Sequence, residues 1–257
     1  MLKLAGITPH PPIIVPGVGN EKDLTKVADT IDAMTKMAES IKEKDIDTVV
    51  IITPHGALDG KFNVYDSKRF TSSLPGALLN FDGNSSLADK ISEIENAKKL
   101  ESGKLDHGTS VPMHFFQEKS PKIKVVPVTY STEDRSEHFD FGKKLFEKIN
   151  QQKEKIALIA SGDLSHKLKP SAPAGFSEKG EKFDKKLIKL LKKRKEKKVL
   201  KMNQELIMEA GQCGYRSIIV LLGALSQTEH NSEVLSYEGP FGVGYGVLRY
   251  NIENDEN

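Results

Sequence analysis

Three short histidine motifs each follow directly on an apolar run that is rich in Val, Ile and Ala. The motifs are Thr8-Pro9-His10-Pro11-Pro12, Thr53-Pro54-His55-Gly56 and Ser161-Gly162-Asp163-Leu164-Ser165-His166. Imidazole is the commonest metal ligand in proteins and the usual acid/base near neutral pH. The motifs therefore predict a divalent metal site with a histidine acid/base beside it.

His10 and His55 share a Thr-Pro-His context, and this repetition favours a joint role as metal ligands. Prolines on both sides stiffen the loop that carries His10, so a ligand is held there at a low entropic cost. Gly56 allows backbone conformations that other residues resist and leaves room for a bound molecule. The alternative is that both histidines end their strands and bind nothing.

His166 has the sequence setting of a general base. Asp163 is close enough in sequence to accept the ring N–H, which would orient the imidazole and raise its basicity. The alternative is that Asp163 caps a helix beside a surface histidine. His107, preceded by Asp106, is a candidate for substrate binding, whereas we expect His138 and His230 to be solvated among charged residues.

A metal that must also bind substrate needs a third protein ligand and open positions. Two histidines and one carboxylate supply this arrangement for non-haem Fe(II). The candidates for the third ligand are Glu209, Gln212, Cys213 and Glu238, and spacing does not choose among them. Cys213 itself fits either a small buried hydrophobic position or a thiol activated at a helix N-terminus.

The predicted strands and helices that must position these residues indicate an α/β protein. Leu2–Ile7, Thr48–Ile52, Ile123–Val128 and Ile156–Ala160 are mostly apolar, which is typical of strands covered on both faces. Because ligands collect outside the carboxyl ends of such strands, the three motifs are expected to meet at one edge. Strand–helix alternation predicts a mixed or mostly parallel central sheet with helices on both faces.

The remaining elements follow from periodicity and from breaker residues. We predict helices, a long Gly/Ser/Pro-rich excursion and three further strands. The helices are 21–44, 86–97, 113–117, 137–151, 178–191, 197–210 and 216–225; the excursion is 67–84; the strands are 62–65, 233–237 and 244–250. We read the Gly-rich segment 239–246 as a bend between strands, because it lacks the Lys and the following helix of a phosphate loop.

Composition limits the class of protein. The 257 residues are 37% hydrophobic, enough for one core, and we expect a single domain over 1–257 with a disordered tail at 253–257. A net charge of +2 gives no global field for nucleic acid. The basic cluster 182–201 fits a solvated helix face or, alternatively, a patch for an anionic partner. With one cysteine and no long apolar run, we expect a cytoplasmic protein that does not contact membranes.

Five motifs, taken in order, resemble those of the LigB-like class III extradiol dioxygenases, and the branch resembled most is the Memo-like proteins of the AmmeMemoRadiSam system. The motifs are His10-Pro11-Pro12-Ile13-Ile14-Val15-Pro16, Pro54-His55, Leu105-Asp106-His107-Gly108-Thr109-Ser110-Val111-Pro112, Ser161-Gly162-Asp163-Leu164-Ser165-His166 and Cys213-Gly214-Tyr215-Arg216-Ser217. The resemblance extends from residue 2 to about residue 250.

The resemblance implies roles for individual residues. His10 and His55 match the two histidine ligands of Fe(II), and His166 matches the catalytic acid/base, with Asp163 beside it. His107 matches a second active-site histidine, and we place His114, Pro11 and Gly56 with it around the substrate. Gln212 stands where relatives carry a ligand glutamate, and Cys213 lines up with the active-site cysteine of Memo-like proteins, so Zn or Cu are alternatives to iron.

The function implied by the resemblance is O₂-dependent opening of the ring of a small aromatic diol of the catechol type. An alternative is a Memo-like protein that uses the same cleft to bind a peptide or partner, or for copper-linked redox chemistry. Zinc-dependent hydrolysis is a third interpretation, but it needs three strong ligands. A homo-oligomer and partner proteins of the AmmeMemoRadiSam system are the macromolecular partners that we expect.

Overall fold

The computed structural model describes residues 1–74 and 77–253, and its centre is a row of four parallel strands. These are β7 (Lys124–Thr129), β2 (Thr48–Thr53), β8 (Ile156–Ser161) and β1 (Leu2–Thr8), hydrogen-bonded in that order. All four match the strands predicted from apolar runs. Parallel pairing brings their carboxyl ends to the same edge of the sheet.

Alternate residues of these strands face two separate hydrophobic layers. Leu4, Val49 and Ile159 belong to one layer, whereas Ile7, Val50 and Leu158 belong to the other. All six are fully buried, and burial of such a side chain contributes about 1.5–3 kcal/mol. Burial on both faces explains why the runs show no polar alternation.

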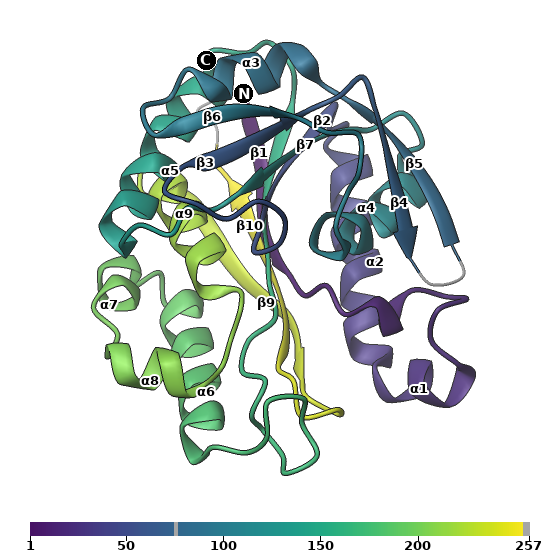
Figure 1. The fold of residues 1–257 in the computed structure, drawn as a ribbon, viewed down its shortest axis with the longest axis vertical. Coiled ribbons are helices and arrows are strands. Elements are labelled where there is room, and N and C mark those ends of the chain that lie inside the picture. Colours follow the sequence, from purple (N-terminus) through teal and green to yellow (C-terminus); the bar gives the residue numbers. More distant parts are fainter. Residues whose placement is uncertain (75–76, 254–257) are drawn as a thin grey trace.

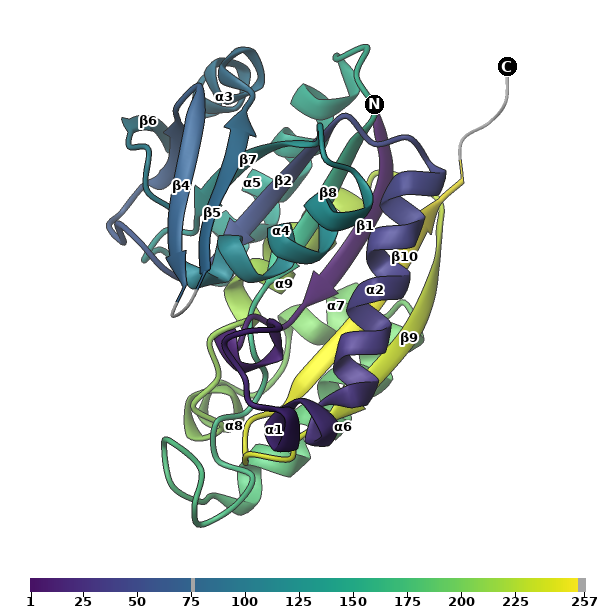
Figure 2. The same ribbon diagram turned by 90° about the vertical axis from the view of Figure 1, so that its right-hand side faces the viewer.

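Helices cover both faces of the sheet, as predicted (Figures 1 and 2). On one face lie α2 (Ala28–Glu43) and α4 (His107–Lys119), and on the other lie α5 (Arg135–Asn150) and α9 (Tyr215–Leu225). Beyond Arg216 and Ser217 in its first turn, the α9 helix is apolar on every side and is buried between the sheet and α5. The predicted α/β architecture is therefore confirmed. In the part of the chain that the structure describes, no helix is long and apolar enough to cross a membrane.

Further strands extend the sheet at both ends, antiparallel beyond β1 and in both directions beyond β7. Beyond β1 lie β10 (Tyr245–Ile252) and β9 (His230–Glu238). Beyond β7 lie β5 (Ala77–Gly83) with β4 (Arg69–Leu74), and β3 (Phe62–Asp66) with β6 (Ala97–Glu101). The sheet is thus mixed, with a parallel centre.

The predicted excursion at 67–84 is wrong, because β4 and β5 form a hairpin there. Phe70 and Phe81 are opposite each other in the register and are buried, and such cross-strand aromatic pairs stabilise a sheet. Frequent Ser and Gly residues hid this pattern in the sequence. The helix predicted to reach residue 97 is α3 (Ser85–Ser92), and β6 follows it.

Other helix boundaries also differ from the prediction. The long helix predicted at 21–44 divides at Val27 into α1 (Glu21–Lys26) and α2. The helix predicted at 197–210 is two short ones, α7 (Glu196–Leu200) and α8 (Gln204–Glu209), because the Asn203 side chain caps a new helix. The basic α6 (Glu178–Lys192) is as predicted. The tail predicted at 253–257 lies, from residue 254 onward, outside the described residues.

Candidate metal centre and active site

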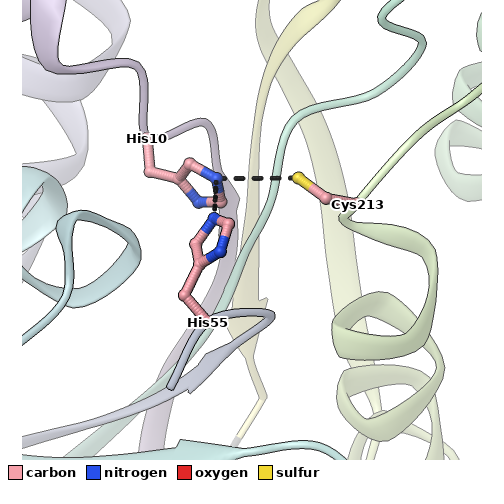
Figure 3. Close-up of side chains that lie close together, drawn as sticks. All are labelled: His10, His55 and Cys213. Carbon is pink, nitrogen blue, oxygen red and sulfur yellow. Dashed lines mark hydrogen bonds between the residues drawn. The ribbon is translucent and has the colours of Figure 1, made fainter. Parts of the chain in front are cut away.

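Two of the predicted histidines meet at the carboxyl edge of the sheet (Figure 3). His10 follows β1 and His55 follows β2, and their Nε2 atoms lie 3.2 Å apart. The Sγ atom of Cys213, just before α9, lies 3.6 Å from Nε2 of His10. These three ligand atoms all lie within 4.8 Å of one another.

Ser161 determines which nitrogen of His10 is free to bind a metal. The Ser161 hydroxyl donates its hydrogen to the Gly108 carbonyl at 2.5 Å, so Oγ must accept from Nδ1 of His10 at 2.9 Å. Nδ1 therefore carries the proton, and the lone pair of Nε2 points at His55 and Cys213. A second hydrogen bond on the far nitrogen is the usual device for orienting a metal-binding histidine. This role of Ser161 was not predicted, although a polar residue at the end of a buried strand is a visible signal in the sequence.

His55 and His107 are positioned by the start of α4. Asp106 caps this helix through Thr109 N–H and also accepts from the Thr53 hydroxyl at 2.9 Å. The His55 and His107 ring centroids lie 4.1 Å apart. Gly108 is required here, since a Cβ would lie 2.4 Å from Thr53 Oγ1. The helix that begins at His107 was predicted only from residue 113. Its first residue places a third imidazole beside His10 and His55.

Burial and mutual proximity keep the cluster neutral. Desolvation, followed by the nearby His55 and His107, holds the pKa of His10 well below its ordinary value. Desolvation also lowers the pKa of His55 and of His107. Neutral imidazole is the form that binds a metal. Burial raises the pKa of the Cys213 thiol, with the Asp163 carboxylate adding to the effect, so a cation would be needed to make it a thiolate.

Two glycines bring Cys213 to the end of β8. A Cβ on Gly162 would lie 2.1 Å from Gly214 Cα, so the two backbones touch only because neither residue has a side chain. The N–H groups of Cys213 and Gly214 both donate to the Asp163 carbonyl, at 3.3 and 3.0 Å. This contact joins α9 to the third histidine motif.

Asp163 does not orient His166, and this detail of the prediction is wrong. The Asp163 carboxylate accepts from the backbone N–H of His10 at 3.0 Å, and desolvation raises its pKa to about 7. Nδ1 of His166 is buried and has no hydrogen-bond partner among the described residues. His166 is nevertheless near enough to lower the pKa of His10 and of His55, so it lies beside the cluster.

The alternatives for the third ligand occupy different positions. The Gln212 side-chain oxygen accepts from Tyr215 N–H at 2.7 Å, at the start of α9. Glu238 accepts from the backbone and hydroxyl of Thr30 on α2, and Glu209 is exposed. Among the Cys and Glu candidates of the described residues, Cys213 is the one whose ligand atom belongs to the histidine group, and the Gln212 oxygen already accepts a backbone N–H.

The remaining predicted residues lie around this centre or away from it. Pro11 is buried beside His10, and Gly56 is exposed with φ of +107°, where a Cβ would lie 2.3 Å from the Tyr65 hydroxyl. His114 is half-buried on α4, about two turns beyond His107, with desolvation lowering its pKa. The prediction that His138 and His230 are solvated is wrong, because both are buried. The His138 ring lies between the carbonyls of Asp134 and Ser131.

Two of the three separations between the ligand atoms fit a single ion, and the third is within 4.8 Å. Ligands at about 2.1 Å (nitrogen) and 2.3 Å (sulfur) around a tetrahedral metal are about 3.4–3.6 Å apart. The His10–His55 and His10–Cys213 separations of 3.2 and 3.6 Å agree with this. Three ligands from the protein leave at least one position open, which is typical of a catalytic metal site.

The chain is similar to proteins of one family. The family model described as the catalytic LigB subunit of aromatic ring-opening dioxygenase matches residues 4–248. A Clostridium acetobutylicum protein is 34% identical over an alignment of 266 positions, which covers 95% of this chain and 56% of that protein. This chain thus spans about half the length of that relative.

Two further relatives and one solved structure agree with the family match. A 3,4-dihydroxyphenylacetate 2,3-dioxygenase of Escherichia coli is 23% identical over 80% of this chain and 83% of its own length. A MEMO1 family protein of Thermococcus onnurineus is 27% identical over 47% of this chain and 42% of its own. The crystal structure of an uncharacterized Escherichia coli K12 protein has the same fold, with a TM-score of 0.69 at 14% identity, over 96% of this chain and 99% of that one.

These matches confirm the resemblance that the histidine motifs suggested. The family match covers the four central strands together with His10, His55, His107, His166 and Cys213. The chain therefore belongs to the family of the catalytic LigB subunit of aromatic ring-opening dioxygenases.

Proposed function

We propose that this protein is a cytoplasmic, metal-dependent oxidoreductase of the extradiol type, acting on a small aromatic diol and O₂. The observation that carries the proposal is the convergence of His10 and His55, whose Nε2 atoms lie 3.2 Å apart at the carboxyl edge of the sheet. Family membership supports the reaction class, and the name of the Escherichia coli dioxygenase supports a catechol-like substrate.

The chain's own residues would divide the work in this reaction. His10, His55 and Cys213 would hold the metal, which we propose to be Fe(II); when bound, the metal brings the diol oxygens and O₂ together and withdraws charge from them. Desolvation lowers the pKa of His166, so its ring is neutral near pH 7 and is able to take a proton from a diol hydroxyl. His107, next to His55, would contact the substrate, with His114, Pro11 and Gly56 farther out.

A second candidate function rests on Cys213. Cu(I) and Zn prefer a soft thiolate ligand to a carboxylate. In the part of the chain that the structure describes, the ligand group contains no carboxylate oxygen. The similarity of part of this chain to a MEMO1 family protein supports this alternative. In that case the cleft would serve copper-linked redox chemistry or the binding of a partner, with no ring opening.

Metal analysis and oxygen uptake together separate the two candidates. Protein purified without oxygen would be analysed for Fe, Cu and Zn, and then mixed with 3,4-dihydroxyphenylacetate and other catechols in an oxygen electrode. We expect iron and stoichiometric O₂ uptake. We also expect His166→Ala to slow turnover by about 10²–10⁴-fold while retaining the metal, since general acid/base groups contribute that much.

His230→Gln is the matched control for the histidine variant. His230 pairs with Ile252 near the amino end of β1, at the opposite edge of the sheet from the cluster, so turnover should not change. Copper or zinc in the purified protein, with no O₂ uptake after loading with iron, would contradict the dioxygenase proposal and support the second candidate.

A further inference from the structure

The position of the His166 ring depends on the backbone that carries it. Nδ1 of His166 is buried and has no hydrogen-bond partner among the described residues, and the Asp163 carboxylate accepts from His10 instead. Desolvation lowers the pKa of His166, and the carbonyls of Leu164 and Gly211 raise it in part, so both carbonyls lie near the ring. Anything that fixes this stretch of backbone therefore also fixes the imidazole.

Backbone hydrogen bonds join the stretch around His166 to two other segments. His166 N–H donates to the carbonyl of Ala210, at the end of α8, at 3.1 Å. Leu164 N–H donates to the Gly244 carbonyl, and Gly244 N–H donates to the Ser165 carbonyl, both at 2.8 Å. Gly244 lies directly before β10. These bonds use main-chain atoms only, and they leave Ser165 N–H to be satisfied by a side chain.

That side chain is Asp184 on α6. Its Oδ1 accepts from Ser165 N–H at 2.9 Å, and its Oδ2 accepts from the Tyr237 hydroxyl on β9 at 2.8 Å. Asp184 is fully buried, and a Cβ on Gly244 would lie 2.1 Å from Oδ2. Each carboxyl oxygen thus has one donor, in a space that is closed around it.

Asp184 is buried without a cation. Over residues 1–74 and 77–253, no Lys, Arg or His nitrogen lies within 4.0 Å of its carboxyl group. Desolvation accordingly raises the pKa of Asp184 to about 7. Burial of a carboxyl group in this way costs folding free energy, and groups that lower stability in this way are typical of functional sites.

We propose that Asp184 is a positioning residue for His166, because it holds Ser165 N–H and thereby keeps the next residue's imidazole beside the metal centre. The inference rests on the proposed function and adds a residue that touches neither His10, His55 nor Cys213. Both forms of the carboxyl group are able to do this. When it is protonated, one oxygen still accepts from Ser165 and the hydroxyl donates to the Tyr237 oxygen.

The test separates the contacts of Asp184 from its charge. Iron-loaded protein would be assayed with 3,4-dihydroxyphenylacetate in an oxygen electrode, as the wild type, Asp184→Ala and Asp184→Asn. Asp184→Ala frees Ser165 N–H, and we expect kcat to fall about 10- to 100-fold, since a small displacement of a catalytic group has that effect. KM and metal affinity should not change. Asp184→Asn should keep the kcat of the wild type, because the amide accepts from Ser165 and donates to Tyr237.

Asn84→Ala is the matched control for the loss of a buried polar anchor. Asn84 donates to the Thr48 hydroxyl at 2.9 Å and accepts from Leu87 N–H at 3.1 Å, at the start of β2 and far from the carboxyl edge. Its removal should lower stability and leave kcat unchanged. If Asp184→Ala does not fold, Tyr237→Phe removes one of the two donors and should lower kcat without changing KM.

Three kinetic outcomes would overturn the proposal. They are a folded Asp184→Ala or Tyr237→Phe protein with the kcat of the wild type, a loss of kcat in Asp184→Asn as large as in Asp184→Ala, and a loss of kcat that is matched by a loss of metal affinity. The last result would mean that Asp184 supports the whole site and not His166.

A measurement of backbone order keeps the inference distinct from the proposed reaction. Relaxation of ¹⁵N in the full chain, loaded with diamagnetic Zn, needs no turnover. The Ser165 and His166 amides should have order parameters of about 0.85 in the wild type and Asp184→Asn, and below about 0.6 in Asp184→Ala. If no catechol is consumed, the proposed function fails, but this difference should remain. The same order parameters in all three proteins would refute the positioning role.

Discussion

At the scale of single residues, one hydroxyl determines the orientation and the tautomer of the proposed metal ligand His10. Ser161 donates to the Gly108 carbonyl and therefore accepts from Nδ1 of His10. Ser161→Ala removes that acceptor, so the His10 ring is free to rotate and to change its tautomer. We expect metal affinity to fall about 10- to 100-fold, as for other outer-shell partners of metal ligands, when it is measured by competition with a chromogenic chelator.

A control for Ser161→Ala is available on α9. The Ser226 hydroxyl donates to the Gly223 carbonyl within one helix, and Ser226→Ala should bind the metal as the wild type does. If Ser161→Ala also binds the metal normally, the orientation of His10 must come from the packing of its loop and not from this hydrogen bond.

A buried carboxyl group beneath the His166 loop gives a residue-scale prediction about pH. Asp184 on α6 accepts from Ser165 N–H at 2.9 Å and from the Tyr237 hydroxyl at 2.8 Å, and desolvation raises its pKa to about 7. The unfolded chain releases this proton near pH 4 and the folded chain near pH 7, so the wild type loses stability as pH rises through that window.

Asp184→Asn has no such proton to lose. The free energy of unfolding of the wild type should therefore fall relative to Asp184→Asn by about 4 kcal/mol between pH 4 and pH 7.5, in urea unfolding followed by circular dichroism. A difference between the two proteins that is the same at every pH would show that Asp184 is ionised in the folded protein throughout.

At the scale of elements, the site depends on how closely α9 approaches the end of β8. Gly162→Ala would place a Cβ 2.1 Å from Gly214 Cα, so the turn that carries Cys213 would have to move away from His10. Overpacking of this kind costs about 1–3 kcal/mol. We expect that loss in thermal unfolding together with weaker metal binding.

Gly103→Ala is the comparison variant for the close approach. A Cβ there meets no heavy atom nearer than 3.4 Å, so both stability and metal binding should stay within error of the wild type. A Gly162→Ala protein that is less stable but binds the metal normally would mean that Cys213 is not a ligand.

At the scale of the whole molecule, the proposed metal joins three elements that are distant in the chain. The ligands follow β1, follow β2 and precede α9, so an ion bound only to the folded state stabilises all of them together. A metal at about 100 times its dissociation constant contributes about 2.7 kcal/mol, which is roughly 5–10 °C in Tm for a chain of this size. The measurement is thermal unfolding with the metal and with a chelator, and His10→Ala should abolish the difference.

The sheet centre and the positions of His10 and His55 were predictable because their signals in the sequence are local. The apolar runs of β1, β2, β7 and β8 are buried on both faces. Strands in that environment consist almost entirely of apolar residues, so their composition predicts it. His10 and His55 follow two of these runs, and the shared edge of a parallel sheet was enough to expect that they meet. The β4–β5 hairpin was not predicted. Ser and Gly residues interrupt the alternation of apolar and polar residues in these strands, and the residue that pairs with Phe70 lies on the other strand.

The sequence by itself determined the layered α/β architecture, the two histidines at its edge and membership of the family, because each of these depends on short motifs and on the period of the apolar residues. Only the tertiary structure decided that Cys213 joins the two histidines while the Gln212 oxygen accepts from Tyr215 N–H, and that Asp163 contacts His10 and not His166. Those choices depend on the Gly162–Gly214 contact and on which hydrogen-bond partners lie within about 3 Å, and such distances between remote segments exist only after the chain has folded.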